Sequence, residues 1–371
     1  MAILLLLSGG CNETLKKSRP EEGETTTKKA LRLDTADGML EYLRSQKLPA
    51  VKEIEPWDGW QNPGLKITTE HYEIYTTLFE PRVIRDIPAF LENCCKSYSK
   101  MIPGRTKTTA KFPVYLFAGR SQWEAFTLEH AGSQAAMYLQ IQSGAYYLNG
   151  ACVAYDIGTD RTFRVLGHEC WHQFADRVFQ LRLPSWLNEG IAMQFETYTY
   201  DKDGQCRFEP AKNNYRLVKL KQALMNEKTI PLEKLLGENP AQAFADSNDG
   251  AVTTFYSQCY ALIRFLCESD YENSFAGFCG ILNDGLTGSW PIEAENKIIA
   301  ADRRIMLTAG WNKAVSCEMF RHYVDSDLEK AEKSYLDFCE KITDKIRLKQ
   351  IADKQLVNDK AFNNKPPDST Q

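Results

Sequence analysis

The stretch HECWH at residues 168–172 decides how the rest of this sequence is interpreted. It lies in a segment, 162–179, whose apolar residues are spaced as in a helix. Residues four apart are neighbours on one helix face, so the imidazoles of His168 and His172 can reach one tetrahedral metal ion. Glu169 lies about 100° further round the helix, where its carboxylate can take a proton from water without binding the metal.

A third ligand follows on the chain. The stretch WLNEGIA at 186–192 begins 14 residues after His172 and belongs to a second helix predicted within 184–198. Glu189 from this helix completes a set of two histidines and one glutamate for Zn²⁺ and leaves the fourth position of the metal for water. The alternative is a pair of surface histidines on a helix. The chain has only five histidines, however, so this spacing around a glutamate favours the zinc site.

The two stretches together resemble the gluzincin metallopeptidases, particularly aminopeptidase N-like enzymes, whose pattern is HExxH followed by WLNEGxAxxxxE. The linker length and the layout before it are closer still to the uncharacterised peptidase-MA-like proteins of the same clan. The resemblance covers 168–196 closely and 66–270 loosely. It implies an α+β fold, in which a lobe with a mixed β-sheet carries the HExxH helix and an α-helical lobe follows. It also implies hydrolysis of a peptide or protein substrate.

Two acidic residues are candidates for supporting the ligands. Glu196 lies seven residues after Glu189 and matches the acidic residue that orients a zinc-bound histidine in aminopeptidase N-like enzymes. A solvated glutamate at a helix end is the alternative. Asp176, four residues after His172, could do similar work, or it could be a surface residue beside Arg177.

A transition-state stabiliser is expected from the second lobe. In aminopeptidase N-like enzymes, a tyrosine that opens a helix, with a small residue three positions later, donates a hydrogen bond to the developing oxyanion. Tyr256 matches that tyrosine, and Cys259 stands where those enzymes have glycine. Tyr260 is the second candidate, and the alternative is that both tyrosines are core aromatics.

The sequence also departs from aminopeptidases. It lacks the GxMEN segment with which they bind the free amine of a substrate, and the interval from His172 to Glu189 is two residues shorter than theirs. We therefore expect an endopeptidase or an unusual hydrolase. Two other interpretations stay open: a non-catalytic envelope lipoprotein with a gluzincin-like fold, and a zinc hydrolase that acts on a non-peptide cell-wall amide.

Outside the two motifs, periodicity predicts the remaining elements. Strands are predicted at 71–76 and 112–117 with a helix at 84–98 between them, and a β-hairpin is predicted at 145–155, where Asn149-Gly150 suits a tight turn. Strand 151–155 is expected to bind a peptide by edge pairing, as in metallopeptidases of this clan, or else to be buried. Further helices are predicted at 213–225, 254–268 and 328–346.

The predicted parts of the chain are a signal-like segment and polar linker (1–30), an N-terminal extension (31–65), the zinc-binding α+β lobe (66–200), the helical lobe (201–345) and a flexible tail (346–371).

The composition is that of an ordinary globular chain. Of 371 residues, 43% are hydrophobic and 25% are charged, and the formal net charge is −4. Lys and Arg are spread along the chain, so no nucleic-acid partner is expected. Setting Cys11 aside, ten cysteines could pair in an oxidising compartment or remain buried thiols, and apolar helical surroundings favour thiols for Cys259, Cys267 and Cys279.

The N-terminus resembles the end of a bacterial lipoprotein signal peptide. An apolar run at 2–7 is followed by Ser8-Gly9-Gly10-Cys11, in which Cys11 would be lipidated after cleavage. We therefore expect an exported protein, held in the cell envelope or secreted, that contacts a membrane only through this lipid. The alternative is an apolar segment without a role.

Overall fold

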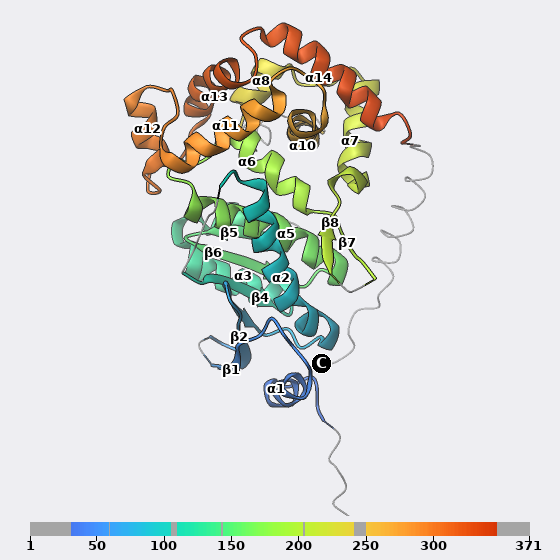
Figure 1. The fold of residues 1–371 in the computed structure, drawn as a ribbon. Coiled ribbons are helices and arrows are strands. Elements are labelled where there is room, and N and C mark those ends of the chain that lie inside the picture. Colours follow the sequence, from blue (N-terminus) through green and yellow to red (C-terminus); the bar gives the residue numbers. More distant parts are fainter. Residues whose placement is uncertain are drawn as a thin grey trace, which may run out of the picture.

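A β-sheet lobe and a helical lobe make up the part of the chain that the computed structural model describes (Figure 1). The described residues are 31–58, 60–104, 110–141, 144–202, 205–240 and 250–346. Cys11, the polar linker and all of the predicted tail except its first residue lie outside them. The fold is mixed α+β with a mixed sheet, which confirms the predicted class.

The sheet has six strands in the order β1-β2-β3-β4-β6-β5. The pairs β3–β4 and β4–β6 are parallel, and the other neighbours are antiparallel. The strands predicted at 71–76 and 112–117 are present, and two further strands lie before them, so the sheet begins within the predicted N-terminal extension. The strand bounds are β1 Glu53–Trp57, β2 Gly64–Thr68, β3 Tyr72–Thr76, β4 Phe112–Phe117, β5 Ala145–Leu148 and β6 Ala151–Tyr155.

The predicted hairpin forms from β5 and β6. Asn149 and Gly150 have φ angles of 51° and 83°, which a tight two-residue turn requires. The prediction that strand 151–155 lies at the edge is wrong, because β6 is hydrogen-bonded to β4 on one side and to β5 on the other. β5 is therefore the edge strand at this end of the sheet.

Helices cover both faces of the sheet. Alternate residues of β6 pack into two separate hydrophobic clusters: Cys152 and Ala154 face the helices α2 and α5, and Val153 faces Trp123 of α3. The phenol of Tyr98 on α2 donates to the carbonyl of Gly167 on α5 at 2.7 Å, which fixes α5 against its neighbour. The helices of this lobe are α1 Ala36–Ser45, α2 Pro81–Met101, α3 Arg120–Ala131, α4 Ala135–Tyr138, α5 Thr159–Val178 and α6 Ser185–Ala192.

The helical lobe is built around α10 (Figure 1), which packs against α6, α7, α11 and α14. The helices predicted at 213–225, 254–268 and 328–346 are present. The bounds are α7 Asn214–Met225, α8 Leu232–Gly237, α10 Ala251–Glu268, α11 Ser274–Thr287, α12 Ala294–Ala301, α13 Ala309–Tyr323 and α14 Leu328–Thr343. The chain between α6 and α7 forms a two-stranded sheet of β7 Tyr198–Tyr200 and β8 Cys206–Phe208 and the short 3₁₀ turns Met193–Phe195 and Pro210–Lys212. A further 3₁₀ turn, Gly132–Gln134, joins α3 to α4.

Gly190 lets the two lobes approach closely. A Cβ atom at this position of α6 would lie 2.6 Å from the carbonyl oxygen of Cys259 on α10 and 2.5 Å from Cγ1 of Ile263. No side chain fits in that space. The glycine that follows Glu189 in the sequence thus sets the distance between the helix carrying Glu189 and the centre of the helical lobe.

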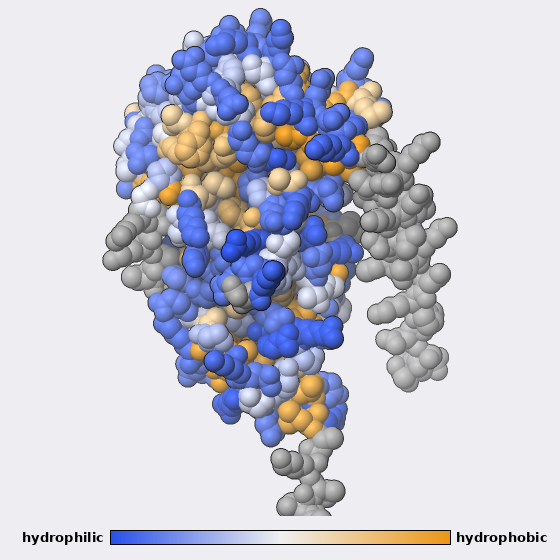
Figure 2. Space-filling view, turned by 45° about the vertical axis from the view of Figure 1, so that its right-hand side comes forward, coloured by the Kyte–Doolittle hydropathy of each residue, from blue (hydrophilic) through white to orange (hydrophobic). Residues whose placement is uncertain are grey.

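The exposed surface shown in Figure 2 is mostly polar, and the described cysteines form no disulfide. The face in Figure 2 is mostly hydrophilic, with apolar residues gathered mainly over the helical lobe, where Phe275 and Ile298 are exposed. Within the described ranges, no helix is both long and apolar enough to cross a membrane. The ten cysteines described are free, with Cys259 buried and Cys267 and Cys279 partly exposed.

Candidate metal centre

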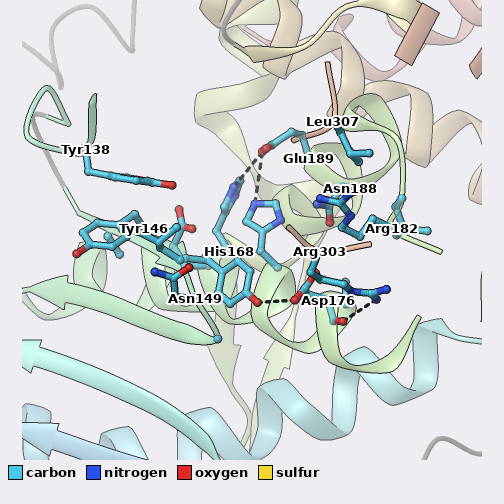
Figure 3. A pocket seen from close by; sticks show the side chains of 18 of the residues that line it. Tyr138, Tyr146, Asn149, His168, Asp176, Arg182, Asn188, Glu189, Arg303 and Leu307 are labelled. Carbon is cyan, nitrogen blue, oxygen red and sulfur yellow. Dashed lines mark hydrogen bonds and ion pairs between the residues drawn. The ribbon is translucent and has the colours of Figure 1, made fainter. Parts of the chain in front are cut away.

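The three predicted ligands lie together at the contact between α5 and α6. His168, His172 and Glu189 each offer a ligand atom, and these atoms lie within 4.8 Å of one another. Oε2 of Glu189 is 3.3 Å from Nε2 of His168 and 3.6 Å from Nε2 of His172. Figure 3 shows both imidazoles directed at the carboxylate. The helical spacing of the two histidines therefore produces the expected convergence on Glu189.

The arrangement has the properties of a cation site. Oε2 of Glu189 is buried, and no described side chain gives it a hydrogen bond of good geometry, although both histidine Nε2 atoms lie nearby. A buried carboxylate oxygen without a hydrogen bond is costly. Two imidazoles and one carboxylate, with room for water, form the donor set of a catalytic zinc site. The three side chains therefore fit Zn²⁺.

Glu196 orients one of the candidate ligands. Its Oε1 lies 3.0 Å from Nδ1 of His168, which leaves Nε2 of that ring facing Glu189. Its Oε2 accepts hydrogen bonds from Nε of Arg216 and Nδ2 of Asn213, each at 2.9 Å. Burial disfavours the charge of Glu196, but the Arg216 guanidinium and His168 outweigh burial and hold the pKa well below its usual range. Glu196 is thus a largely buried, hydrogen-bonded carboxylate rather than a solvated residue at a helix end.

No pattern in the sequence indicates that Arg216 and Asn213 take part in this site. Asn213 precedes α7 and accepts a hydrogen bond from the backbone N–H of Arg216 at 3.3 Å, as an N-cap does. A polar residue before a predicted helix is visible in a sequence. The reach of both side chains back to Glu196 depends on the tertiary fold.

The carboxylates make the centre attractive to positive charge. Burial alone lowers the pKa of His168, but the Glu189 carboxylate, whose Oε2 lies 3.3 Å from its Nε2, and the hydrogen bond with Glu196 raise the value to about 10. Burial also lowers the pKa of His172, and the charge of Glu189 more than compensates, so that the net shift is upward. The same attraction acts on any cation at this position, whether a proton or a metal ion.

Glu169 lines the same cavity as the three ligands, but it does not belong to the group whose atoms converge. Burial raises the pKa of Glu169, and the two nearby histidines only partly oppose this effect. A carboxylate with a raised pKa is a stronger base than an exposed glutamate. These properties suit the predicted general base.

The two candidate tyrosines have different surroundings. Tyr256 lines the cavity, and burial, followed by the charges of Glu189 and Glu169, raises its pKa well above the usual value, so the phenol keeps its proton. Tyr260 is fully buried, and its hydroxyl donates to the carbonyl of Pro210 at 2.6 Å. Tyr256 can therefore meet a ligand in the cavity, whereas Tyr260 has a structural hydrogen bond.

Asp176 lies in the cavity wall, but its contacts differ from the expectation. Its Oδ2 accepts from the hydroxyl of Tyr147 at 2.8 Å, and its Oδ1 lies 3.5 Å from Nε of Arg303. The described contacts include none between Asp176 and His172, and none with Arg177. The i,i+4 spacing places Asp176 on the same face of α5 as His172. Its carboxylate nevertheless contacts Tyr147 of the β5–β6 hairpin and Arg303 of the loop before α13 instead of the histidine.

The cavity has a volume of about 610 Å³ and lies between the β5 hairpin, helices α5 and α6, and the helical lobe. Tyr138 and Tyr146 lie at one end, and Arg182 and Arg303 lie at the other, with the candidate ligands between the two ends (Figure 3). A ligand that fills the cavity would therefore contact an aromatic end, the metal centre and a cationic end.

Comparison with known proteins finds no family model, no curated protein and no solved structure that matches this chain significantly.

Metal analysis tests the ligand set. Protein purified without chelator is expected to carry about one zinc ion per chain, because the three side chains fit a single tetrahedral ion. His168→Ala and His172→Ala should each lose the metal, since two ligands do not hold it. The exposed His322 provides the control, and His322→Ala should keep it. Equal metal content in wild type and all three variants, measured by mass spectrometry, would contradict the assignment.

Glu196→Gln tests the supporting carboxylate. Loss of an outer hydrogen-bond partner of a zinc-bound histidine costs about 10–100-fold in metal affinity. The matched control is Glu92→Gln, because Glu92 holds Nδ1 of His71 at 2.7 Å in the same manner, away from the cavity. Zinc titration of both variants should show weaker binding for Glu196→Gln alone. Thermal unfolding in excess zinc separates this effect from a loss of folding. Unchanged zinc affinity in Glu196→Gln would refute the positioning role.

Proposed function

We propose that this protein is a zinc-dependent peptidase of the gluzincin type. Zn²⁺ would be held by His168, His172 and Glu189, with Glu169 as the general base. The observation that carries the proposal is the convergence of the three ligand atoms in a cavity that Glu169 and Tyr256 also line. The layout supports it as well, because the sheet lobe supplies α5 and the helical lobe supplies α10.

In the proposed hydrolysis, Glu169 transfers protons and Tyr256 stabilises the oxyanion. When bound, Zn²⁺ supplies a Lewis acid that lowers the pKa of water toward about 7 and polarises a carbonyl group. Glu169 accepts the proton of the attacking water, and the same carboxylate then passes the proton to the leaving amine. The protonated phenol of Tyr256 donates a hydrogen bond to the oxygen of the substrate carbonyl as it becomes an oxyanion.

A peptide substrate is favoured over another amide by the position of β5. The strand lies at the sheet edge, and all of its residues line the cavity beside the metal centre. An edge strand offers a row of backbone donors and acceptors, to which an extended peptide can add as a further strand. This role belongs to 145–148 rather than to 151–155, since β6 is paired on both sides. We also propose export through a lipid on Cys11, which the apolar run at 2–7 and the small residues at 8–10 support.

Glu169→Gln separates the base from the ligands. The variant should keep its zinc, because Glu169 is not one of the converging ligands, and it should lose hydrolysis by about 10²–10⁴-fold, because the proton acceptor is gone. The measurement is cleavage of a mixed peptide library, with a chelator control, alongside metal analysis. A variant that still cleaves the peptides at the wild-type rate would show that another group acts as the base.

Tyr256→Phe tests the oxyanion donor. The change removes only the hydroxyl, so zinc content should stay constant while kcat falls by about 10²–10³-fold and KM hardly changes. Tyr260→Phe on the same helix is the control: it loses the hydrogen bond to Pro210, so stability should fall by about 1 kcal/mol with kcat preserved. If Tyr260→Phe is instead the variant that loses turnover, the assignment of Tyr256 is wrong.

A further inference from the structure

One wall of the cavity presents hydrogen-bond donors that lack acceptors. Arg182 lines this wall (Figure 3). Its Nε donates to a backbone carbonyl at 3.1 Å, and its Nη2 donates to three more at 2.7–2.8 Å, so the side chain is held in one orientation. Within the described residues, Nη1 of Arg182 has no hydrogen-bond partner. The carbonyls that hold the side chain belong to Ile299, Ala300, Asp302 and Ile305.

Asn188 adds donors of the same kind. Its Oδ1 accepts from the indole N–H of Trp171 at 3.0 Å, and Trp171 is fully buried, so the orientation of the amide is fixed. The Nδ2 group must then face away from that bond. No described residue accepts from it, although Asn188 lines the cavity beside Glu189. A donor pair is therefore available between the metal centre and Arg182.

The charge of this end is positive. Arg303 gives both Nη atoms to backbone carbonyls, so it contributes charge rather than spare donors. The carboxylate of Asp176 compensates the charge of the Arg303 guanidinium. The carboxylate of Asp302 forms an ion pair with Arg304 at 2.7 Å. Of the residues that line this end of the cavity, Arg182 and Arg303 against Asp176 leave one net positive charge. Burial and the neighbouring Arg303 both lower the pKa of Arg182, which means that its charge is disfavoured as it stands.

We propose that the wall formed by Arg182, Asn188 and Arg303 binds a carboxylate group of the substrate. An anionic acceptor would satisfy the free donors of Arg182 and Asn188 and relieve the repulsion between the two guanidinium groups. In a peptide, this carboxylate is either the C-terminus or the side chain of an acidic residue. The inference rests on the proposed peptidase function, for which it defines a substrate class.

The test uses full-length, zinc-loaded protein that carries Glu169→Gln, so that bound peptides are not consumed. Two random libraries of N-acetylated hexapeptides serve as probes, one with a free C-terminal carboxylate and one with a C-terminal amide. Retention on immobilised protein is measured by mass spectrometry at low and high salt. Hydrolysis by the zinc-loaded wild type is measured separately, so a failure of the carboxylate preference is distinguishable from a failure of the peptidase function.

Carboxylate peptides are expected to bind about tenfold more tightly than their neutral counterparts, with a smaller difference at high salt. A preference for free C-termini identifies the terminal carboxylate as the group bound. Enrichment of Asp or Glu over Asn or Gln within the amidated library identifies a side chain. Either result supports the proposal, and equal binding of carboxylate and neutral peptides, or no binding of either, overturns it.

Isosteric variants test whether the carboxylate preference arises at this wall of the cavity. Asn188→Asp keeps the acceptor for Trp171 but replaces the free donors by a negative charge, so the carboxylate preference should disappear. Asp176→Asn keeps an acceptor for Tyr147 and removes the offsetting charge, so the preference should rise severalfold. Asn149→Asp is the matched control, since it makes the same charge change on the hairpin side of the same cavity (Figure 3). A preference that is unchanged by Asn188→Asp and Asp176→Asn, or lowered equally by Asn149→Asp, overturns the placement.

Discussion

The hydrogen bond from the indole of Trp171 to Asn188 joins the two helices on which the candidate centre depends. Trp171 stands between the two histidines in the sequence, and Asn188 directly precedes Glu189. This partly buried contact thus helps to fix α6 against α5 at the level of the ligands. The rest of the fold supports this contact: α2 fixes α5 from one side, and the close approach at Gly190 fixes α6 against α10. The ligand geometry therefore follows from helix packing rather than from a loop.

Charge compensation explains why so many ionisable groups can be buried together. Glu169, Glu189 and Glu196 would be costly in a buried site if they were alone. Arg216 neutralises the carboxylate of Glu196, and the histidines attract the carboxylate of Glu189. What remains is a negative centre that favours a cation, next to a wall that carries one net positive charge. The two neighbouring regions of one cavity therefore differ in the charge that they attract: a cation at the centre and an anion at the wall.

Local spacing made the central parts of the molecule predictable. Two histidines four residues apart on a helix must share a face, and Asn149-Gly150 must favour a tight turn, whatever the surrounding fold. Contacts between distant segments were not predictable in this way. The hairpin alone could not reveal that β6 pairs with β4, and Asp176 is 127 residues away in the sequence from Arg303, which lies beside it. The choice between Tyr256 and Tyr260 likewise needed the position of α10 relative to the cavity.

The division of the cavity between two lobes also has a consequence for biosynthesis. A ribosome completes the segment with His168, His172 and Glu189 before it reaches Tyr256, which follows Glu189 by 67 residues. The face of α6 that carries Trp186 and Gly190 packs against α13 and α10, so it is covered only when the helical lobe has been made and docked. A nascent chain can therefore contain every candidate ligand while its cavity still lacks one wall. Under the proposed mechanism, the newly made enzyme stays inactive until synthesis of the helical lobe is complete.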